Sequence, residues 1–273
     1  TQEENLYFQF PLDIDIYLGA KIIRHTVWVS AKGENIFTFP ATKEPELVNI
    51  NPEGVIVMEE EYLKSVKELL YQVQHAPELK SRMQAITSLG ENEGKEVLLA
   101  ALRDPYFKVR NMALERLSDF SLNKKELAQV EKLATSDPSN IAKSAAIWVL
   151  SSSKENKRYT ALYEKALTTP SGAVKNAALN AIAHTNPKRA KDFLEKADPK
   201  ELEIDQLAGL TGVIADNKMT QYLPTLMPYL VNYPFLEEDN PEIAADFKKA
   251  YLWAMSLDDK NLVEQMQKAY KDL

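Results

Sequence analysis

Residues that could carry out chemistry are few in this chain and stand far apart. The three histidines, His25, His75 and His184, fall in different predicted elements. No HExxH occurs, so the helical two-histidine zinc site with its glutamate base is absent. The chain has no cysteine, which excludes disulfides, thiolate nucleophiles and cysteine-ligated zinc. We therefore expect no catalytic residue, no metal ligand and no cofactor in this chain.

Other catalytic and phosphate-binding patterns are missing as well. The sequence contains no GxSxG, GxGxxG or GxxxxGK[ST]. Serines such as Ser151 fall where loops collect them for turn formation. The acidic runs at residues 59–61 and 237–239 are more typical of solvated helix starts and loops than of calcium sites.

Four copies of one sequence pattern occur in the chain, and the helices that they predict position the basic and aromatic residues discussed below. The clearest copy is DPYFKVRNMALERL at residues 104–117, with versions at 137–150 and 169–182 and a looser one at 76–89. Each copy has a proline, then a basic residue five positions later, then an alanine three positions after that. These are Pro77, Pro105, Pro138 and Pro170; Arg82, Arg110, Lys143 and Lys175; and Ala85, Ala113, Ala146 and Ala178. The prolines lie 28, 33 and 32 residues apart, which indicates a repeated supersecondary unit.

The repeats predict paired helices. The pairs are residues 79–89 with 94–102, 107–117 with 124–133, 140–150 with 157–167, and 172–182 with 187–196. One hairpin cannot bury such an apolar stripe alone, so the pairs must stack as an α-solenoid, and the small alanine marks close helix contact. The pattern resembles HEAT-like repeats. After residue 198 it degenerates, because prolines 224, 228 and 234 shorten or kink the helices. Residues 242–255 and 261–270 are expected to cap the open end.

The shared spacing of the basic residues has two interpretations. Proline at a helix start costs no hydrogen bond, and Asp104 and Asp137 can cap the same helices. The ladder of Arg82, Arg110, Lys143 and Lys175 could then reach an acidic cap in the neighbouring repeat. Alternatively, these cations contact a partner.

One repeat position could mark a binding surface. Trp148 stands where the other copies have Thr87, Glu115 and Asn180, a position that is otherwise polar and so expected to be exposed. Trp148 is either an inter-repeat packing residue or an anchor on the inner face of the solenoid, where aromatic anchors carry interface energy. The aromatic and proline-rich tract at residues 222–235 is similarly either core packing or a contact for a peptide or domain.

The first part of the chain reads as strands. Apolar residues alternate from residue 12 to 58, with turn residues between about five short runs at residues 14–16, 22–29, 36–39, 47–50 and 55–58. This predicts a small antiparallel β-sandwich at residues 11–58, packed on the helices or on something upstream. A helix with an acidic first turn at residues 59–61 then leads into the α-solenoid of residues 59–273. Residues 4–9, ENLYFQ, match a protease site used to remove purification tags, so residues 1–10 are either a tag remnant or an edge strand.

Composition narrows the class of protein. The 273 residues carry a net charge of -7, which argues against nucleic-acid binding. No run of about 18 apolar residues occurs, so we expect a soluble protein without a membrane span. The absence of cysteine leaves the cytoplasm and the periplasm open.

The junction between the two parts resembles the C-terminal region of M1-family zinc aminopeptidases over residues 11–117. The matching residues are Phe37, Phe39, Pro40, Pro45, Val48, Asn49, Asn51 to Gly54, Ala76, Pro77 and Arg82. The resemblance implies an Ig-like β-domain followed by an armadillo-like helical domain from a hydrolase, with zinc only in a missing catalytic domain. The family's HExxH and GxMEN motifs are absent here.

Three functions follow from these patterns. The first is a non-catalytic region that walls the substrate chamber of a metallopeptidase, docks on its catalytic domain and meets peptide substrate only indirectly. The second is a free-standing HEAT-like scaffold that binds another protein. The third is a catalytically dead relative of the aminopeptidases that serves as an adaptor. Substrate preference, parent activity and oligomeric state are not encoded in any motif.

Overall fold

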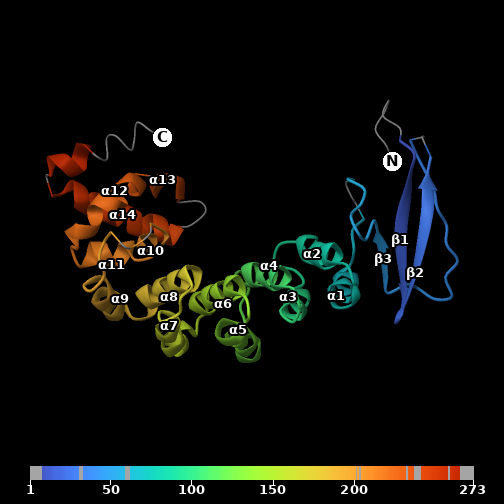
Figure 1. Cartoon of the computed structure of the whole chain (residues 1–273), viewed down its shortest axis with the longest axis horizontal. Helices are drawn as coiled ribbons and strands as arrows, with labels where there is room; N and C mark the ends of the chain where they lie inside the picture. Colours follow the sequence, from blue (N-terminus) through green and yellow to red (C-terminus); the bar gives the residue numbers. More distant parts are fainter. Residues whose placement is uncertain are drawn as a thin grey trace. The chain divides into compact units, whose positions relative to one another are not determined.

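The computed structural model describes residues 8–30, 33–58, 62–200, 202, 204–231, 233–236, 241–257 and 259–264. The chain divides into two compact units, residues 1–122 and 123–273. Figure 1 shows a small β-sheet followed by paired helices, which confirms the predicted fold class of a mainly α chain with an N-terminal antiparallel β part. The domain limit at residues 58 and 59 stays a prediction.

The first unit begins with an antiparallel sheet of β1 (Phe10–Leu18), β2 (Lys21–Val29) and β3 (Leu47–Ile50), in the order β2-β1-β3. Gly19, with φ of 65°, allows the two-residue turn between β1 and β2. The even-numbered side chains of β1 form an apolar face with residues of the other two strands. The odd-numbered side chains Asp13, Asp15 and Tyr17 lie on the opposite face.

The prediction of five strands and two sheets was wrong for the described residues. Residues 36–39 are extended but outside any strand, and Phe39 packs on the apolar face of the sheet. Residues 55–58 are also outside any strand, and Val57 is fully exposed. Apolar alternation alone does not provide a hydrogen-bonding partner, and neither segment has one in the sheet.

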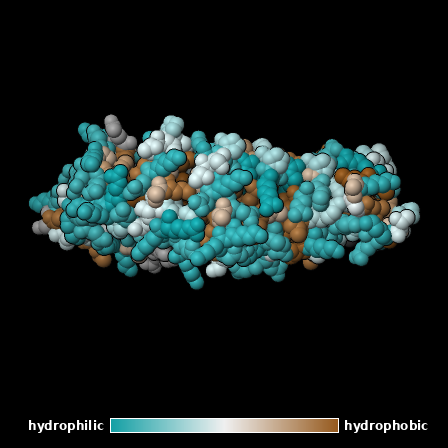
Figure 2. Space-filling view, turned by 90° about the horizontal axis from the view of Figure 1, so that it is seen from below, coloured by the Kyte–Doolittle hydropathy of each residue, from teal (hydrophilic) through white to brown (hydrophobic). Residues whose placement is uncertain are grey.

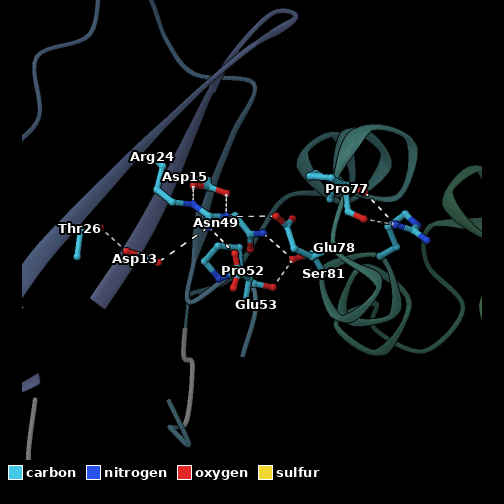
Figure 3. A network of polar contacts seen from close by, with 12 residues as sticks. Asp13, Asp15, Arg24, Thr26, Asn49, Pro52, Glu53, Pro77, Glu78 and Ser81 are labelled. Carbon is cyan, nitrogen blue, oxygen red and sulfur yellow. Dashed lines mark hydrogen bonds and ion pairs between the residues drawn. The ribbon is translucent and has the colours of Figure 1, made fainter. Parts of the chain in front are cut away.

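A polar seam joins the sheet to the helices of the first unit (Figure 3). Arg24 holds the buried Asp15 through two hydrogen bonds of 2.8 and 2.9 Å and also contacts Glu53 and Glu78. Asn49 donates to the hydroxyl of Ser81 at 2.8 Å, and that hydroxyl donates to the carbonyl of Pro52. The helical side of the sheet is therefore held by directed polar contacts.

Tyr17 and Tyr71 pack edge to face in this seam. Their hydroxyl groups differ in hydrogen bonding. The rings of Tyr17 and Tyr71 are 5.9 Å apart, and the Tyr71 hydroxyl donates to the carbonyl of Gly19 at 2.6 Å. Tyr17 is 1% exposed, and its hydroxyl has no hydrogen-bond partner among the described residues. Burial, followed by the nearby Glu78 and Asp15 carboxylates, raises the pKa of Tyr17 to about 12.

Replacing each tyrosine with phenylalanine should separate these roles. Tyr71→Phe removes a hydrogen bond and should lower the free energy of unfolding by about 1 kcal/mol. Tyr17→Phe removes a hydroxyl without a partner and should leave it unchanged or raised. Urea denaturation at pH 7 measures both, and an equal loss in the two variants would contradict this account.

Tyr17 should also make the protein sensitive to alkali. Because its pKa is raised from 10 to about 12, the unfolded chain loses this proton first as the pH rises. The free energy of unfolding should fall between pH 10 and 12, by up to about 2 kcal/mol from this group. Denaturation at pH 8 and 11 should show a smaller fall in Tyr17→Phe than in Tyr71→Phe, which keeps Tyr17. Burial also raises the pKa of Tyr163, which adds to the fall in both variants.

The helices of the first unit form two rows. They are α1 (Val66–His75), α2 (Leu79–Thr87), α3 (Lys95–Ala101) and α4 (Phe107–Leu117). Figure 1 shows α2 beside α4 and α1 beside α3, as their contacts also indicate. The alanines Ala85 and Ala113 and the neighbouring Val109 are completely buried. The predicted close approach at the repeat alanine is confirmed.

The second unit continues the pattern and then departs from it. Its elements are α5 (Lys124–Ser136), α6 (Asn140–Ser152), the 3-10 turn η1 (Asn156–Tyr159), α7 (Thr160–Ala166), α8 (Gly172–Thr185), α9 (Pro187–Leu194), α10 (Ile204–Ala208), α11 (Thr211–Asp216), the 3-10 turn η2 (Thr220–Tyr222), α12 (Leu223–Leu230), α13 (Tyr233–Leu236) and α14 (Pro241–Met255). Ala146, Ala178 and Leu179 are buried between α6, α8 and their neighbours. The expected short helices after residue 198 are present, with Pro228 inside α12. Of the predicted helix at 261–270, residues 265–270 lie outside the described residues.

The helix starts differ from the prediction in two ways. The helix expected from residue 59 begins at Val66, because Ser65 and Glu68 form a reciprocal capping box. Residues 59–61 and 237–239 lie outside the described residues. The repeat prolines precede the N-cap instead of occupying the first helical position, and the Asp104 carboxylate accepts the N–H of Tyr106 at 2.8 Å. Asp137 accepts the N–H of Ser139 in the same way.

Candidate protein-binding surface

The exposed side of α6 carries the aromatic residue singled out from the repeats. Trp148 is 42% exposed and Ile141, seven residues earlier, is 50% exposed. Residues seven apart lie two helical turns apart on one side. Ala145 lies between them, and Ala146, Ile147 and Leu150 are buried on the opposite side. We call Ile141, Ala145 and Trp148 the α6 face.

The α6 face carries no charge. Its neighbours Ser144 and Ser151 donate their hydroxyls to the carbonyls of Ile141 and Trp148, at 2.8 and 2.9 Å. These hydroxyls are satisfied within the helix. In contrast, hydrophilic residues predominate on the molecular face shown in Figure 2, with apolar residues in separate patches. The α6 face can therefore accept apolar side chains without removing a charge from water.

The equivalent side of α8 is covered by the chain itself. Asn180, at the position of Trp148, is 5% exposed, so the expectation of exposure there was wrong. Its amide lies against Gly209, which follows α10, and a Cβ atom on Gly209 would come within 1.2 Å of the Asn180 Oδ1. Asn180 donates to the carbonyl of Asn176 at 2.9 Å. Tertiary packing by distant residues, which the repeat pattern does not encode, buries this position.

Thr87 and Glu115 are exposed at the same repeat position in the first unit. The Asn111 amide donates to the Glu115 carboxylate at 2.6 Å, one helical turn away. These side chains are polar and face water. Thr87 and Glu115 therefore share only the repeat position with Trp148. Neither has a large apolar side chain that a partner could bind.

The first basic residue of the ladder lies against the next repeat. The Arg82 guanidinium donates to the Asp104 carboxylate at 2.6 Å and to the carbonyls of Ala76 and Pro77. The Asp104 side chain is 2% exposed and the Arg82 side chain 14%. Arg110 bonds the corresponding carbonyls of Asp104 and Pro105, at 2.8 and 3.0 Å. Each arginine closes the loop before its own helix.

The two lysines behave differently. Within the described residues, no ion pair joins Lys143 or Lys175 to a carboxylate, and both are half-buried. In the fourth repeat Thr169 replaces the aspartate and accepts the N–H of Ser171 at 3.3 Å. A lysine ammonium lacks the planar fork with which arginine bonds several carbonyls at once.

A double-mutant cycle on Arg82 and Asp104 should show strong coupling. We expect a coupling energy of about 1–3 kcal/mol from Arg82→Met, Asp104→Asn and the double variant, because the pair is shielded from water. The exposed pair of Glu155 and Arg158, 3.4 Å apart, is the control and should give less than about 0.5 kcal/mol. Equal coupling energies in the two pairs would show that the Arg82–Asp104 ion pair stabilises the protein no more than an exposed surface ion pair does.

A shallow pocket of about 370 Å³ lies beside this ion pair. Its lining includes His75, Arg82, Arg103 and Asp104. His75 packs against the ring of Tyr71, and Arg82 is already held by Asp104. The pocket has no nucleophile and base in contact, so its geometry offers no catalytic arrangement.

The three histidines take no part in a shared site in the described structure. His25 stacks on Phe39 at 4.4 Å, and His184 contacts the carbonyl of Asn180. Across the described residues, no group of three or more His, Cys, Asp or Glu side chains could hold a metal ion. In the 222–235 tract, Tyr222, Leu223, Leu226 and Met227 are buried, while Tyr229 and Phe235 are exposed. Every helix searched is too short or too polar to cross a lipid bilayer, within the part of the chain described.

One family model matches part of the helical region, and two solved structures resemble the chain at low identity. A family model for HEAT repeats matches residues 66–151. A designed armadillo repeat protein in complex with the peptide (KR)4 is 16% identical, with a TM-score of 0.38, covering 70% of this chain and 99% of that one. The complex of CpcE and CpcF of phycocyanin lyase from Nostoc sp. PCC7120 is 13% identical, with a TM-score of 0.40, covering 79% of this chain and 98% of that one. No curated protein matches the chain.

These findings overturn the resemblance to M1-family aminopeptidases. The matched family is HEAT repeats, and the match covers the helical end of the junction, including Ala76, Pro77 and Arg82. The β part is a three-stranded sheet in the described residues, which removes the Ig-like sandwich. A catalytic-domain partner, a peptidase parent and a hydrolase class therefore have no support. Among the junction residues, Asn49, Pro52 and Glu53 belong to the polar seam, and Ala76 and Pro77 to the loop before the first repeat.

Proposed function

We propose that this chain is a protein-binding scaffold that takes a partner on the α6 face, with Trp148 as the anchor. Helical repeats bind partners through surfaces that successive helices build together. The observation that supports this use is the exposure of Trp148 and Ile141 on one uncharged side of α6. The partner would present apolar side chains there.

The comparison of α6 with α8 strengthens the proposal. The same position on α8 is already covered by the loop after α10, with Asn180 against Gly209. The helix surface is therefore suited to close contact with another segment of polypeptide. On α6 the corresponding surface has a large aromatic side chain, of the kind that dominates binding energy at interfaces.

Site-specific photocrosslinking tests the proposal. A photoreactive amino acid at Ala145 in the full chain should capture a partner, whereas the same group at Lys132, which is exposed on α5, should not. The affinity of the captured protein should then be measured with purified components. Trp148→Ala should weaken binding by about 30-fold or more, as expected for an anchor residue.

Leu252→Ala provides a matched control, because Leu252 is 58% exposed on α14 and lies outside the α6 face. It should leave the affinity unchanged. Unchanged binding by Trp148→Ala, or equal crosslinking from position 132, would refute the proposed surface. Circular dichroism of each variant separates lost binding from lost folding.

A further inference from the structure

The outer edge of β2 is a long strand edge to which no described residue hydrogen-bonds. The carbonyls of Asp13 and Tyr17 on β1 accept N–H groups of Asn51 and Glu46, next to β3. The odd-numbered residues of β1 thus direct their backbone groups toward β3, and the even-numbered ones toward β2. The register pairs Ile14 with His25 and Ile16 with Ile23, so the backbone groups of the intervening β2 residues point outward.

Four residues of β2 therefore offer free backbone donors and acceptors. They are Ile22, Arg24, Thr26 and Trp28. Among the described residues, no backbone group bonds to this edge. Proteins commonly shield such edges with proline, bulges, short strands or charges directed outward. By contrast, β3 on the opposite side of the sheet has four residues, whereas β2 has nine.

The side chains on this edge do not block an added strand. The Arg24 guanidinium is held over the sheet by Asp15, Glu53 and Glu78. The Thr26 hydroxyl donates to the Asp13 carboxylate at 2.6 Å. Phe39 packs on the apolar face, which places the nearby loop on a face of the sheet. The large exposed apolar side chains on β2 are those of Ile22 and Trp28, at 41% and 61% exposure.

We propose that two copies of this chain associate through β2, edge to edge and antiparallel. Full overlap of Lys21–Val29 with its copy centres the pairing on His25. In that register Ile22 faces Trp28 of the other copy, twice by symmetry, and Ile23 faces Val27 on the other side of the sheet. Arg24 faces Thr26, which separates the two arginines.

Self-complementarity of this kind favours a second copy over an unrelated strand. The register with the most backbone hydrogen bonds is also the register that pairs the two exposed apolar side chains. Cross-strand pairs of aromatic and β-branched residues stabilise antiparallel sheets. The product is a continuous six-stranded sheet with β3 and its copy at the outer edges.

The oligomeric state of the full chain gives the first test. Sedimentation equilibrium should show a dimer whose fraction rises with protein concentration. Trp28→Lys should raise the dimer Kd by about tenfold or more, because it replaces two apolar pairs with charges. Val57→Lys is the matched control, since Val57 is fully exposed outside the strand, and it should leave the Kd unchanged. A monomer at every concentration, or equal Kd values for both variants, would overturn the proposal.

A disulfide test reports the register, because the chain has no native cysteine. In the proposed pairing His25 faces its own copy as a non-hydrogen-bonded pair, with Cα atoms about 4.5 Å apart. That distance suits a disulfide, so His25→Cys should form a crosslinked dimer on mild oxidation. Val27→Cys is the control, because its two copies would lie about 14 Å apart, and it should remain reduced. Equal crosslinking of the two variants would refute this register and leave only random collision.

Discussion

Close approach of helices at the repeat alanines is the constraint on which the helical part depends. Ala85, Ala113, Ala146 and Ala178 are completely buried. The repeat helices pack their apolar stripes against neighbouring helices, so a larger side chain at these positions would push the helices apart. The loops that precede the first helix of each pair are shaped to preserve this approach. In two repeats an arginine bonds the carbonyls on either side of the proline, and an aspartate holds the N-cap residue in two.

The sheet joins the repeats of the first unit by a different kind of contact. Its apolar side chains gather on the face away from the seam, while Asp15, Asn49 and Arg24 meet the helical side. Hydrogen bonds and ion pairs are directional, so they specify one orientation of the sheet against α1 and α2 more strongly than apolar packing does. The arginine also keeps three carboxylates together that would otherwise repel one another. The sheet and the first repeats are thus joined by directional polar contacts as well as by buried surface.

Exposure differs among the side chains at the same repeat position. Thr87 and Glu115 face water, Asn180 is buried beneath the chain's own later residues, and Trp148 remains half open beside Ile141. The repeat pattern left two interpretations for Trp148, packing or anchoring, and its side chain is 42% exposed. The uncharged surroundings favour the anchor interpretation, since no charge has to leave water when a partner binds.

The sequence by itself determined the helical repeats and most of the residues at which their helices begin. Proline, basic residue and alanine recur at fixed offsets, and local rules of helix period and spacing are sufficient to interpret them. Local rules were not sufficient for the strands at 36–39 and 55–58, because a strand requires a partner that alternation does not supply. Nor could they place Asn180, whose burial depends on Gly209 almost thirty residues later. Only the tertiary structure decided which strands pair, which edge stays open and which repeat surfaces are covered, because each of these depends on contacts between residues distant in the chain.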